Sequence, residues 1–368
     1  MTKKIFNILV VGASYGSLLA IKFLAAGHNV TMTCRTATAR LMNREGIRVR
    51  LPIKGRKDIG NGGLLEVNSG DLPGLLHAST PQLVDHLGGF DLVVLAMQEP
   101  QYQQDGIRQL MADIARAGLP CMPIMNMPPM PYLKRLQMHN TRLDASACAD
   151  AYADANVWDG FDPDLMTLSS PDPQAFRPVD EPANVLQVAL PTNFKVARFE
   201  SATHTRILQQ LEADIDAVRI DVKGEAIELP VKLKVFDSLF VPLSKWSMLM
   251  TGNYRCIEET TVRPIREAVL GNREESQAVY DWVADVCIAL GGAQDDLVSF
   301  SKYAEAAESL LKPSSAARAL AAGTDHIERV DMVVQMLAAQ LGMHNNTVDQ
   351  TVRRVNDWLN KNRSAVIS

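Results

Sequence analysis

A short loop near the start of the chain has the residue types that can hold phosphate groups. Residues 12–17 read GASYGS, which departs from the dinucleotide-binding fingerprint GxGxxG because Ser14 and Ser17 occupy the second and third glycine positions. A glycine at position 12 can make the tight turn, and small residues at 14 and 17 still let a pyrophosphate approach the start of a following helix. We therefore expect a nucleotide-binding loop, formed by Gly12, Ser14, Tyr15, Gly16 and Ser17.

The same loop has a second interpretation, because residues 12–16 also spell GxSxG. In an α/β-hydrolase this pattern places a nucleophilic serine, here Ser14, on a sharp turn after a central strand. Several strands precede that turn in such enzymes, whereas a single strand precedes it here. The strand order favours nucleotide binding.

The elements around the loop predict a parallel sheet with helical crossovers. Residues 5–11 form a continuous apolar run that ends at Gly12, as in a strand buried on both faces. A helix over residues 18–26 follows, with Gly27 as its C-cap. Further strands are expected over residues 30–34, 90–97 and 120–125. Strand, helix and strand at this spacing indicate a doubly wound α/β domain.

The end of the second expected strand indicates which cofactor the loop prefers. NAD-binding domains place an acidic residue there to hold the ribose 2′-hydroxyl, and NADP-binding domains use a cation for the 2′-phosphate. This chain has Arg35 at that point, Arg40 soon after, and no acidic residue before Glu45. A guanidinium suits a phosphate, so we expect NADP(H). The alternative is that Arg35 is a solvated residue at a strand end.

The rest of the chain predicts an all-helical second domain. Helical patterns are expected over residues 232–250, 274–290, 293–311, 326–341 and 347–360. We therefore place an NADP-binding domain at residues 1–230 and a helical substrate domain at 231–368. Residues 148–191 are rich in Asp, Ala and Pro, and we expect them to be a solvated surface insertion without a metal site.

Two polar residues on the first of these helical segments could take part in catalysis. Lys245 and Asn253 are eight residues apart, slightly more than two turns of an α-helix, so they would share one face. A lysine aimed into a closed site can donate a proton or a hydrogen bond to a developing alkoxide. The alternative for Lys245 is a surface group whose ammonium reaches solvent.

Taken together, these features resemble the ketopantoate (2-dehydropantoate) reductase family over most of the chain. The likeness runs from the glycine loop, through Arg35 in GHNVTMTCR and Asn126 in IMNMPP, to Lys245 and Asn253 in KWSMLMTGN and Ser314 in KPSSAARAL. It implies a Rossmann-type domain followed by an all-α domain like the C-terminal domain of 6-phosphogluconate dehydrogenase. It also implies reduction of a ketone by NADPH. Lys245 and Asn253 would then be catalytic, Asn126 would face both ligands, and Ser314 would bind substrate.

The sequence departs from the family at several site positions. Gln98 stands where the family usually has a lysine, Leu249 replaces an asparagine, and Met127 replaces a glycine. The family's glutamate, twelve residues after its serine, corresponds to His326. Either His326, with Asp325 beside it, contributes to a changed substrate pocket that accepts ketopantoate poorly, or the register shifts and Asp325 or Glu328 takes the glutamate's role.

Composition limits the remaining possibilities. The chain has 368 residues, enough for two cores, and a formal net charge of −5, which gives no electrostatic reason to expect nucleic acid. The five cysteines lack metal-ligand spacing, so we expect reduced thiols in the cytoplasm, and no stretch is long enough for a membrane helix.

We expect a reductase of a small 2-oxo acid or related carbonyl compound, with a homodimer as the candidate assembly. The alternative is a non-catalytic NADP-binding sensor or interaction protein.

Overall fold

The computed structural model describes residues 4–60 and 62–367, which form two compact units. The chain passes between the units more than once, unlike the single boundary expected near residue 230. Of the described residues, the first unit contains 4–60, 62–97, 101–125 and 160–237, and the second contains 98–100, 126–159 and 238–367. Residues 126–159 belong to the second unit because they pack there: the Tyr132 hydroxyl, for example, donates to the carbonyl of Leu239 at 2.6 Å.

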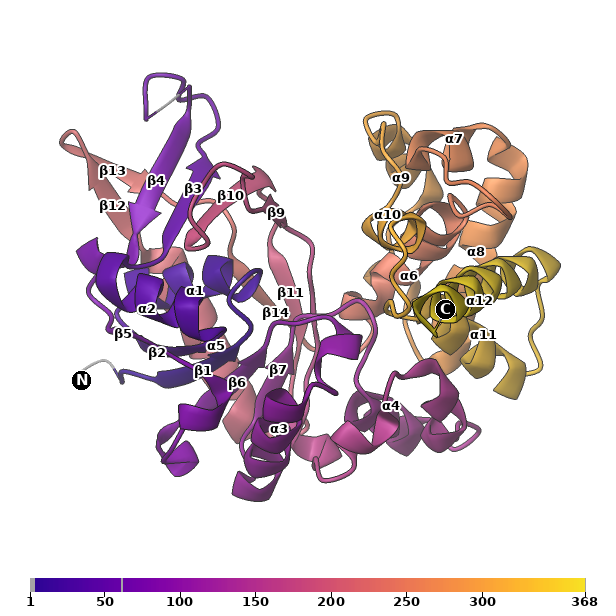
Figure 1. Ribbon diagram of the computed structural model, residues 1–368, viewed down its shortest axis with the longest axis horizontal. Helices are drawn as coiled ribbons and strands as arrows, with labels where there is room; N and C mark the ends of the chain where they lie inside the picture. Colours follow the sequence, from indigo (N-terminus) through magenta and orange to yellow (C-terminus); the bar gives the residue numbers. More distant parts are fainter. Residues whose placement is uncertain (1–3, 61, 368) are drawn as a thin grey trace. The chain divides into compact units, whose positions relative to one another are not determined.

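The first unit is built on a five-stranded parallel sheet (Figure 1). Its strands follow the order β5-β2-β1-β6-β7. Their bounds are Asn7–Val11 for β1, Asn29–Thr33 for β2, Leu76–Ser79 for β5, Leu92–Leu95 for β6 and Cys121–Pro123 for β7. The order reverses at β1, which pairs with β2 on one side and β6 on the other. Ligands of open α/β sheets bind at the carboxyl ends of the strands beside such a reversal.

The residues that form this sheet are those whose apolar runs predicted it. Ile8, Val10, Val93 and Val94 are fully buried, as expected for strands covered on both faces. Helix α1 (Gly16–Ala25) follows β1, and Gly27, just beyond its end, has a φ of +84° that favours glycine. The other helices of this unit are α2 (Thr36–Glu45), α3 (Asp105–Ala117) and α5 (Ala202–Ala217).

Three smaller sheets complete the first unit. One has the order β4-β3-β10-β9, with β3 at Arg48–Pro52, β4 at Leu64–Asn68, β9 at Gln174–Phe176 and β10 at Val185–Leu190. A second has the order β14-β11-β8, with β8 at Ser169–Ser170, β11 at Phe194–Ala197 and β14 at Leu233–Phe236. The third is the hairpin of β12 (Arg219–Val222) and β13 (Glu225–Glu228).

The Asp/Pro-rich stretch 148–191 is not the solvated excursion that its composition predicted. Trp158, Met166 and Leu168 are fully buried, and β8, β9 and β10 all lie within the stretch. Its aspartates instead begin short turns: the carboxylates of Asp154 and Asp162 each accept a hydrogen bond from the backbone N–H two residues later. Such residues favour turns for this local reason, while the apolar residues between them supply the core.

The second unit is helical, as expected. Its helices are α4 (Met130–His139), α6 (Trp246–Met248), α7 (Ile265–Leu270), α8 (Arg273–Leu290), α9 (Phe300–Ala307), α10 (Ser315–Ala321), α11 (Val330–Gln340) and α12 (Asn346–Ile367). The two last helices pack on each other (Figure 1). In the described part of the chain, no helix is both long and apolar enough to cross a membrane.

The prediction of a helix over residues 232–250 is wrong for the first part of that segment. Leu233–Phe236 forms strand β14, which pairs in parallel with β11 of the first unit. The segment is short and apolar, and periodicity alone cannot distinguish a buried strand of this length from part of a helix. Its place beside β11 decided the outcome.

Candidate functional site

The glycine loop is packed too tightly to accept side chains at two positions. Gly12 has a φ of +108°, and a Cβ there would lie 2.6 Å from Met97 Cγ and 2.7 Å from the carbonyl oxygen of Ala96. A Cβ at Gly16 would lie 2.6 Å from Val10 Cγ1. These glycines therefore give the loop the tight turn and the close approach of helix to strand that a dinucleotide cradle requires.

The other loop residues divide into exposed and internally bonded groups. Ser14 is exposed at the tip, whereas Ser17 is buried and its hydroxyl donates to the carbonyl of Ala13. The Tyr15 hydroxyl donates to the carbonyl of Pro173, and burial raises the pKa of this phenol. Ser14 is thus the residue in the loop whose hydroxyl faces solvent, while Ser17 and Tyr15 hold the loop in shape.

Arg35 lies immediately after β2, one strand away from the loop. Arg35 is exposed and directly precedes α2. The end of β2 lies next to the glycine turn, because the backbone N–H of Gly12 donates to the carbonyl of Thr33 at 3.2 Å. The buried hydroxyl oxygen of Thr33 has no hydrogen-bond partner among the described residues. The end of β2 thus presents the guanidinium of Arg35 close to the glycine turn, a donor that fits the 2′-phosphate of NADP(H).

Lys245 and Asn253 lie on an irregular helical segment rather than on a regular α-helix. Lys245 ends the 3₁₀ turn Val241–Lys245, α6 follows it, and Asn253 lies in the π-helical turn Leu249–Tyr254. Both side chains are half-buried. The expectation of a continuous α-helix here is wrong, so a shared face no longer follows from 3.6 residues per turn and stays a prediction.

Tertiary contacts stabilise this π-helical turn. The Tyr303 hydroxyl donates to the carbonyl oxygen of Met248 at 3.0 Å. A Cβ at Gly252 would lie 2.0 Å from that hydroxyl, so glycine is needed for the tyrosine to reach the backbone. Single π-helical turns inside helices occur often at functional sites.

The side chain of Ser314 contacts the backbone of Asn253, not its side chain. The Ser314 hydroxyl donates to the Asn253 carbonyl at 2.7 Å and accepts from the N–H of Ala317 at 3.1 Å, as the N-cap of α10. Ser314 is 3% exposed. Its hydroxyl is therefore already engaged, and its evident contribution is to fix Asn253 against α10.

Asn126 lies beside a carboxyl group that its sequence context did not reveal. A hydrogen bond from the Asn126 side chain lowers the pKa of Glu328, but burial outweighs it and raises that pKa to about 7. The Asn126 Oδ1 is buried and has no hydrogen-bond partner among the described residues. The Trp246 indole N–H donates to the Asn126 carbonyl at 3.2 Å, which ties this residue to the start of α6.

The backbone of a buried glutamate, Glu99, contacts the carboxyl group of Glu328. The Glu99 N–H donates to Glu328 Oε1 at 3.4 Å, and Glu99 Oε2 accepts from the N–H of Ala153 at 3.1 Å. Burial raises the pKa of Glu99 to about 7. Glu99 directly follows Gln98, which is exposed. Sequence reasoning missed Glu99, and the only available signal was an acidic residue just after a buried strand.

His326 is placed differently from Glu328. Its Nδ1 lies 2.9 Å from Asp325 Oδ1, and its side chain is 37% exposed. The hydrogen bond and charge of His326 lower the pKa of Asp325. Of the three residues considered for the family's glutamate, Glu328 is the one that the structure brings next to Asn126.

The four methionines that flank Asn126 in the sequence lie out of solvent. Met122, Met125, Met127 and Met130 are all buried. Met127, which replaces the family's glycine, also accepts a hydrogen bond at its sulfur from the N–H of Arg329 at 3.3 Å.

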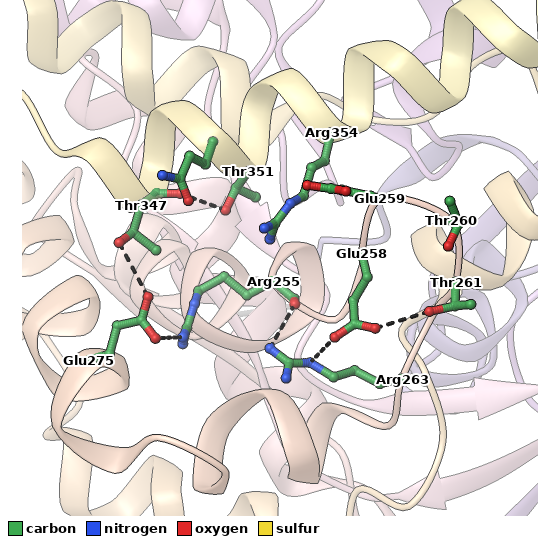
Figure 2. Close-up of a pocket in the computed structure, with 11 residues that line it drawn as sticks. Arg255, Glu258, Glu259, Thr260, Thr261, Arg263, Glu275, Thr347, Thr351 and Arg354 are labelled. Carbon is green, nitrogen blue, oxygen red and sulfur yellow. Dashed lines mark hydrogen bonds and ion pairs between the residues drawn. The ribbon is translucent and has the colours of Figure 1, made fainter.

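A polar pocket of about 450 Å³ in the second unit contains none of these predicted site residues (Figure 2). Its charges are largely paired within its own wall. Arg255 Nη2 lies 3.0 Å from Glu275 Oε2, and Arg263 Nε lies 3.4 Å from Glu258 Oε1 (Figure 2). We interpret this pocket as a structural ion-pair network around the end of the π-helical turn.

Known proteins resemble this chain in fold but hardly in sequence. No protein-family model matches the chain, and no curated protein matches it either. A 2-dehydropantoate 2-reductase from Methylococcus capsulatus is 11% identical, with a TM-score of 0.65 and coverage of 97% of each chain. A D-mandelate dehydrogenase solved with NADH and anilino(oxo)acetate is 11% identical, with a TM-score of 0.60 over 97% of this chain and 99% of that one.

A ketopantoate reductase from Staphylococcus aureus, described as dimeric, is 7% identical, with a TM-score of 0.59 over 97% of this chain and 99% of that one. At these identities the likeness shows the fold. The expected architecture, a Rossmann-type sheet and a helical second part, is confirmed.

Proposed function

We propose that the protein is an NADPH-dependent reductase of a small 2-oxo acid or a related carbonyl compound. The observation that carries this proposal is the glycine loop at the reversal point of the parallel sheet, with Arg35 at the end of the adjacent strand. Support comes from fold neighbours that include a 2-dehydropantoate 2-reductase and a D-mandelate dehydrogenase solved with NADH. Fold alone does not determine chemistry, so the residues must carry the rest of the argument.

The first unit would bind the dinucleotide. Gly12 and Gly16 leave room for the pyrophosphate at the start of α1, where backbone N–H groups and the helix dipole favour an anion. Ser14 presents its hydroxyl there, and Arg35 would pair with the 2′-phosphate. When bound, the cofactor supplies the hydride.

The second unit would bind and polarise the carbonyl compound. Lys245 donates a proton, or a hydrogen bond, to the carbonyl oxygen, on which negative charge develops during reduction. Asn253 orients the substrate, and Ser314 keeps the Asn253 backbone in place. Glu328, positioned by Asn126 and Glu99, takes the role of the family's glutamate and accepts a hydrogen bond from a polar group of the substrate.

The proposal also covers the cellular location and the oligomeric state of the protein. Five free cysteines, four of them buried, support a reducing compartment, and we propose a cytoplasmic location. The dimeric reductase among the fold neighbours supports a homodimer.

The deciding experiment is an assay of NADPH oxidation with a panel of 2-oxo acids that includes ketopantoate, run beside a calorimetric titration with NADPH. Turnover with at least one compound is the expected result. Tight NADPH binding without turnover of any compound would instead favour a non-catalytic NADP-binding sensor on the same scaffold. Failure to bind any nicotinamide dinucleotide would refute both.

A further inference from the structure

A segment of the Asp/Pro-rich stretch lies against the glycine loop. Residues 171–178 run through β9, which is held in its sheet by β10. Two hydrogen bonds connect this segment to the loop. The Tyr15 hydroxyl donates to the carbonyl of Pro173, and Nη2 of Arg177 donates to the carbonyl of Ala13 at 3.1 Å. The segment is also anchored at its start, where Asp172 Oδ2 lies 3.3 Å from Nζ of Lys195.

This arrangement brings a second guanidinium into the region of Arg35. Partial burial lowers the pKa of Arg177, and the positive charge of Arg35 acts in the same direction. Arg177 in turn opposes the rise in the pKa of Cys34 that burial causes. These mutual effects require the three side chains to lie within electrostatic range of one another. The end of β2 and the segment 171–178 therefore share one positively charged corner.

Neither arginine is neutralised by a carboxylate. Among the described residues, no aspartate or glutamate forms an ion pair with Arg35 or Arg177, although most other arginines of the first unit have such partners. Two like charges held near each other without a counter-ion destabilise the folded protein, and a bound anion removes that cost. Arg177 uses one donor for Ala13, and a guanidinium has five.

We propose that Arg177 is a second cation for the 2′-phosphate of NADPH, acting beside Arg35. The inference rests on the proposed function and assigns to the stretch 148–191 a part in cofactor selection. Arg177 is placed by its hydrogen bond to the glycine loop, so its guanidinium is oriented before the cofactor arrives. A preoriented guanidinium loses little side-chain entropy on binding, which favours a bidentate contact with phosphate.

The test is a set of titrations with NADPH, NADH and adenosine 2′,5′-bisphosphate, which carries the 2′-phosphate without the nicotinamide. We expect Arg177→Ala to weaken NADPH and the bisphosphate by about 10- to 100-fold, the equivalent of one hydrogen bond to a charged group, and to leave NADH unchanged. Arg206→Ala is the matched control, because Arg206 is exposed on α5 and bonds to Thr203. Arg177→Gln, a neutral side chain of similar length, serves as a second variant if the alanine variant unfolds at a lower temperature.

The possible outcomes separate this inference from the proposed function. A wild-type protein without affinity for either dinucleotide refutes the proposed function and the inference together. A wild-type protein that binds NADPH, with an Arg177→Ala variant that binds it equally well, refutes the inference alone. An equal loss for NADPH and NADH also overturns the inference, because Arg177 would then contact the pyrophosphate that both cofactors share.

Discussion

The backbone N–H of Glu99 donates to Oε1 of Glu328 at 3.4 Å, which connects the carboxyl group of Glu328 to the backbone of a second, buried glutamate. Burial raises the pKa of Glu99 to about 7, and burial together with the charge of Glu99 raises the pKa of Glu328 to about 7. Negative charge on one carboxylate disfavours negative charge on the other, so the two glutamates prefer to keep a proton between them near neutral pH. Stability and substrate binding should therefore both depend on this pair.

The pair predicts a pH dependence of folding stability. The pKa of Glu99 is about 7 in the folded protein against an ordinary value of 4.5. Between these values the unfolded chain binds fewer protons, so the stability contributed by Glu99 is full below about pH 4.5 and is lost as the pH rises to about 7. A glutamine at position 99 cannot ionise. The free energy of unfolding in urea of Glu99→Gln, minus that of wild type, should therefore be larger at pH 8 than at pH 5 by roughly 2–3 kcal/mol.

The control for this measurement is Glu305→Gln, since Glu305 is an exposed residue on α9. Its stability should change with pH in parallel with wild type. If Glu99→Gln also parallels wild type, burial does not raise the pKa of Glu99 in the folded protein.

Glu328, rather than His326, should matter for the substrate. Glu328→Gln is expected to lower kcat/KM for the best carbonyl substrate by about 10- to 100-fold, because a hydrogen bond to a charged or strongly polar group is lost. His326→Glu should leave kcat/KM with ketopantoate unchanged, since His326 pairs with Asp325 and Glu328 already lies beside Asn126. A His326→Glu variant that reduces ketopantoate markedly better would restore His326 as the specificity residue.

Lys245→Ala should separate catalysis from cofactor binding. Turnover is expected to fall by roughly 10²- to 10⁴-fold, the usual contribution of a general acid, while the NADPH affinity remains close to that of wild type. Lys302→Ala provides the comparison, because Lys302 is exposed on α9. Steady-state kinetics and calorimetry on the same preparations would show this split, and full turnover in Lys245→Ala would remove Lys245 from the mechanism.

Arg35 should determine the preference between the two dinucleotides. Arg35→Ala is expected to weaken NADPH by about 1.5–3 kcal/mol and to leave NADH unaffected, because only NADPH carries the 2′-phosphate. Arg44→Ala is a suitable control, since Arg44 lies on α2, the helix that Arg35 precedes, and pairs with Glu45 at 2.6 Å. Equal affinities of the wild-type protein for NADPH and NADH, measured by calorimetry, would contradict this assignment.

Two glycines allow backbone strain to be distinguished from steric overlap. Gly12 and Gly27 both have positive φ, but only at Gly12 would a Cβ overlap neighbouring atoms, those of Met97 and Ala96. Gly27→Ala should cost about 1–3 kcal/mol of stability from φ strain alone. Gly12→Ala adds overpacking and should cost about 1–3 kcal/mol more, with loss of NADPH binding. Similar unfolding free energies for the two variants would show that the glycine turn can relax.

The amino-acid sequence by itself determined the parallel sheet, the glycine turn and the helical second part. These features depend on local patterns: apolar runs such as β1 and β6 form strands buried on both faces, and Gly12 supplies a turn that other residues resist. Arg35 could be identified in the same way, since its position follows directly from the end of a predicted strand. Local chemistry is sufficient where a residue's neighbours in sequence are also its neighbours in space.

Only the tertiary structure decided the placement and the contacts of Glu99, Glu328 and Arg177. The contact between Glu99 and Glu328 joins residues far apart in sequence, and Arg177 reaches Ala13 because β9 is held in its sheet by β10. The strand β14 and the π-helical turn before Arg255 likewise depend on β11 and Tyr303, not on their own periodicity. Burial and long-range packing set the charge of a carboxyl group and the direction of a guanidinium, and the linear order of residues encodes neither.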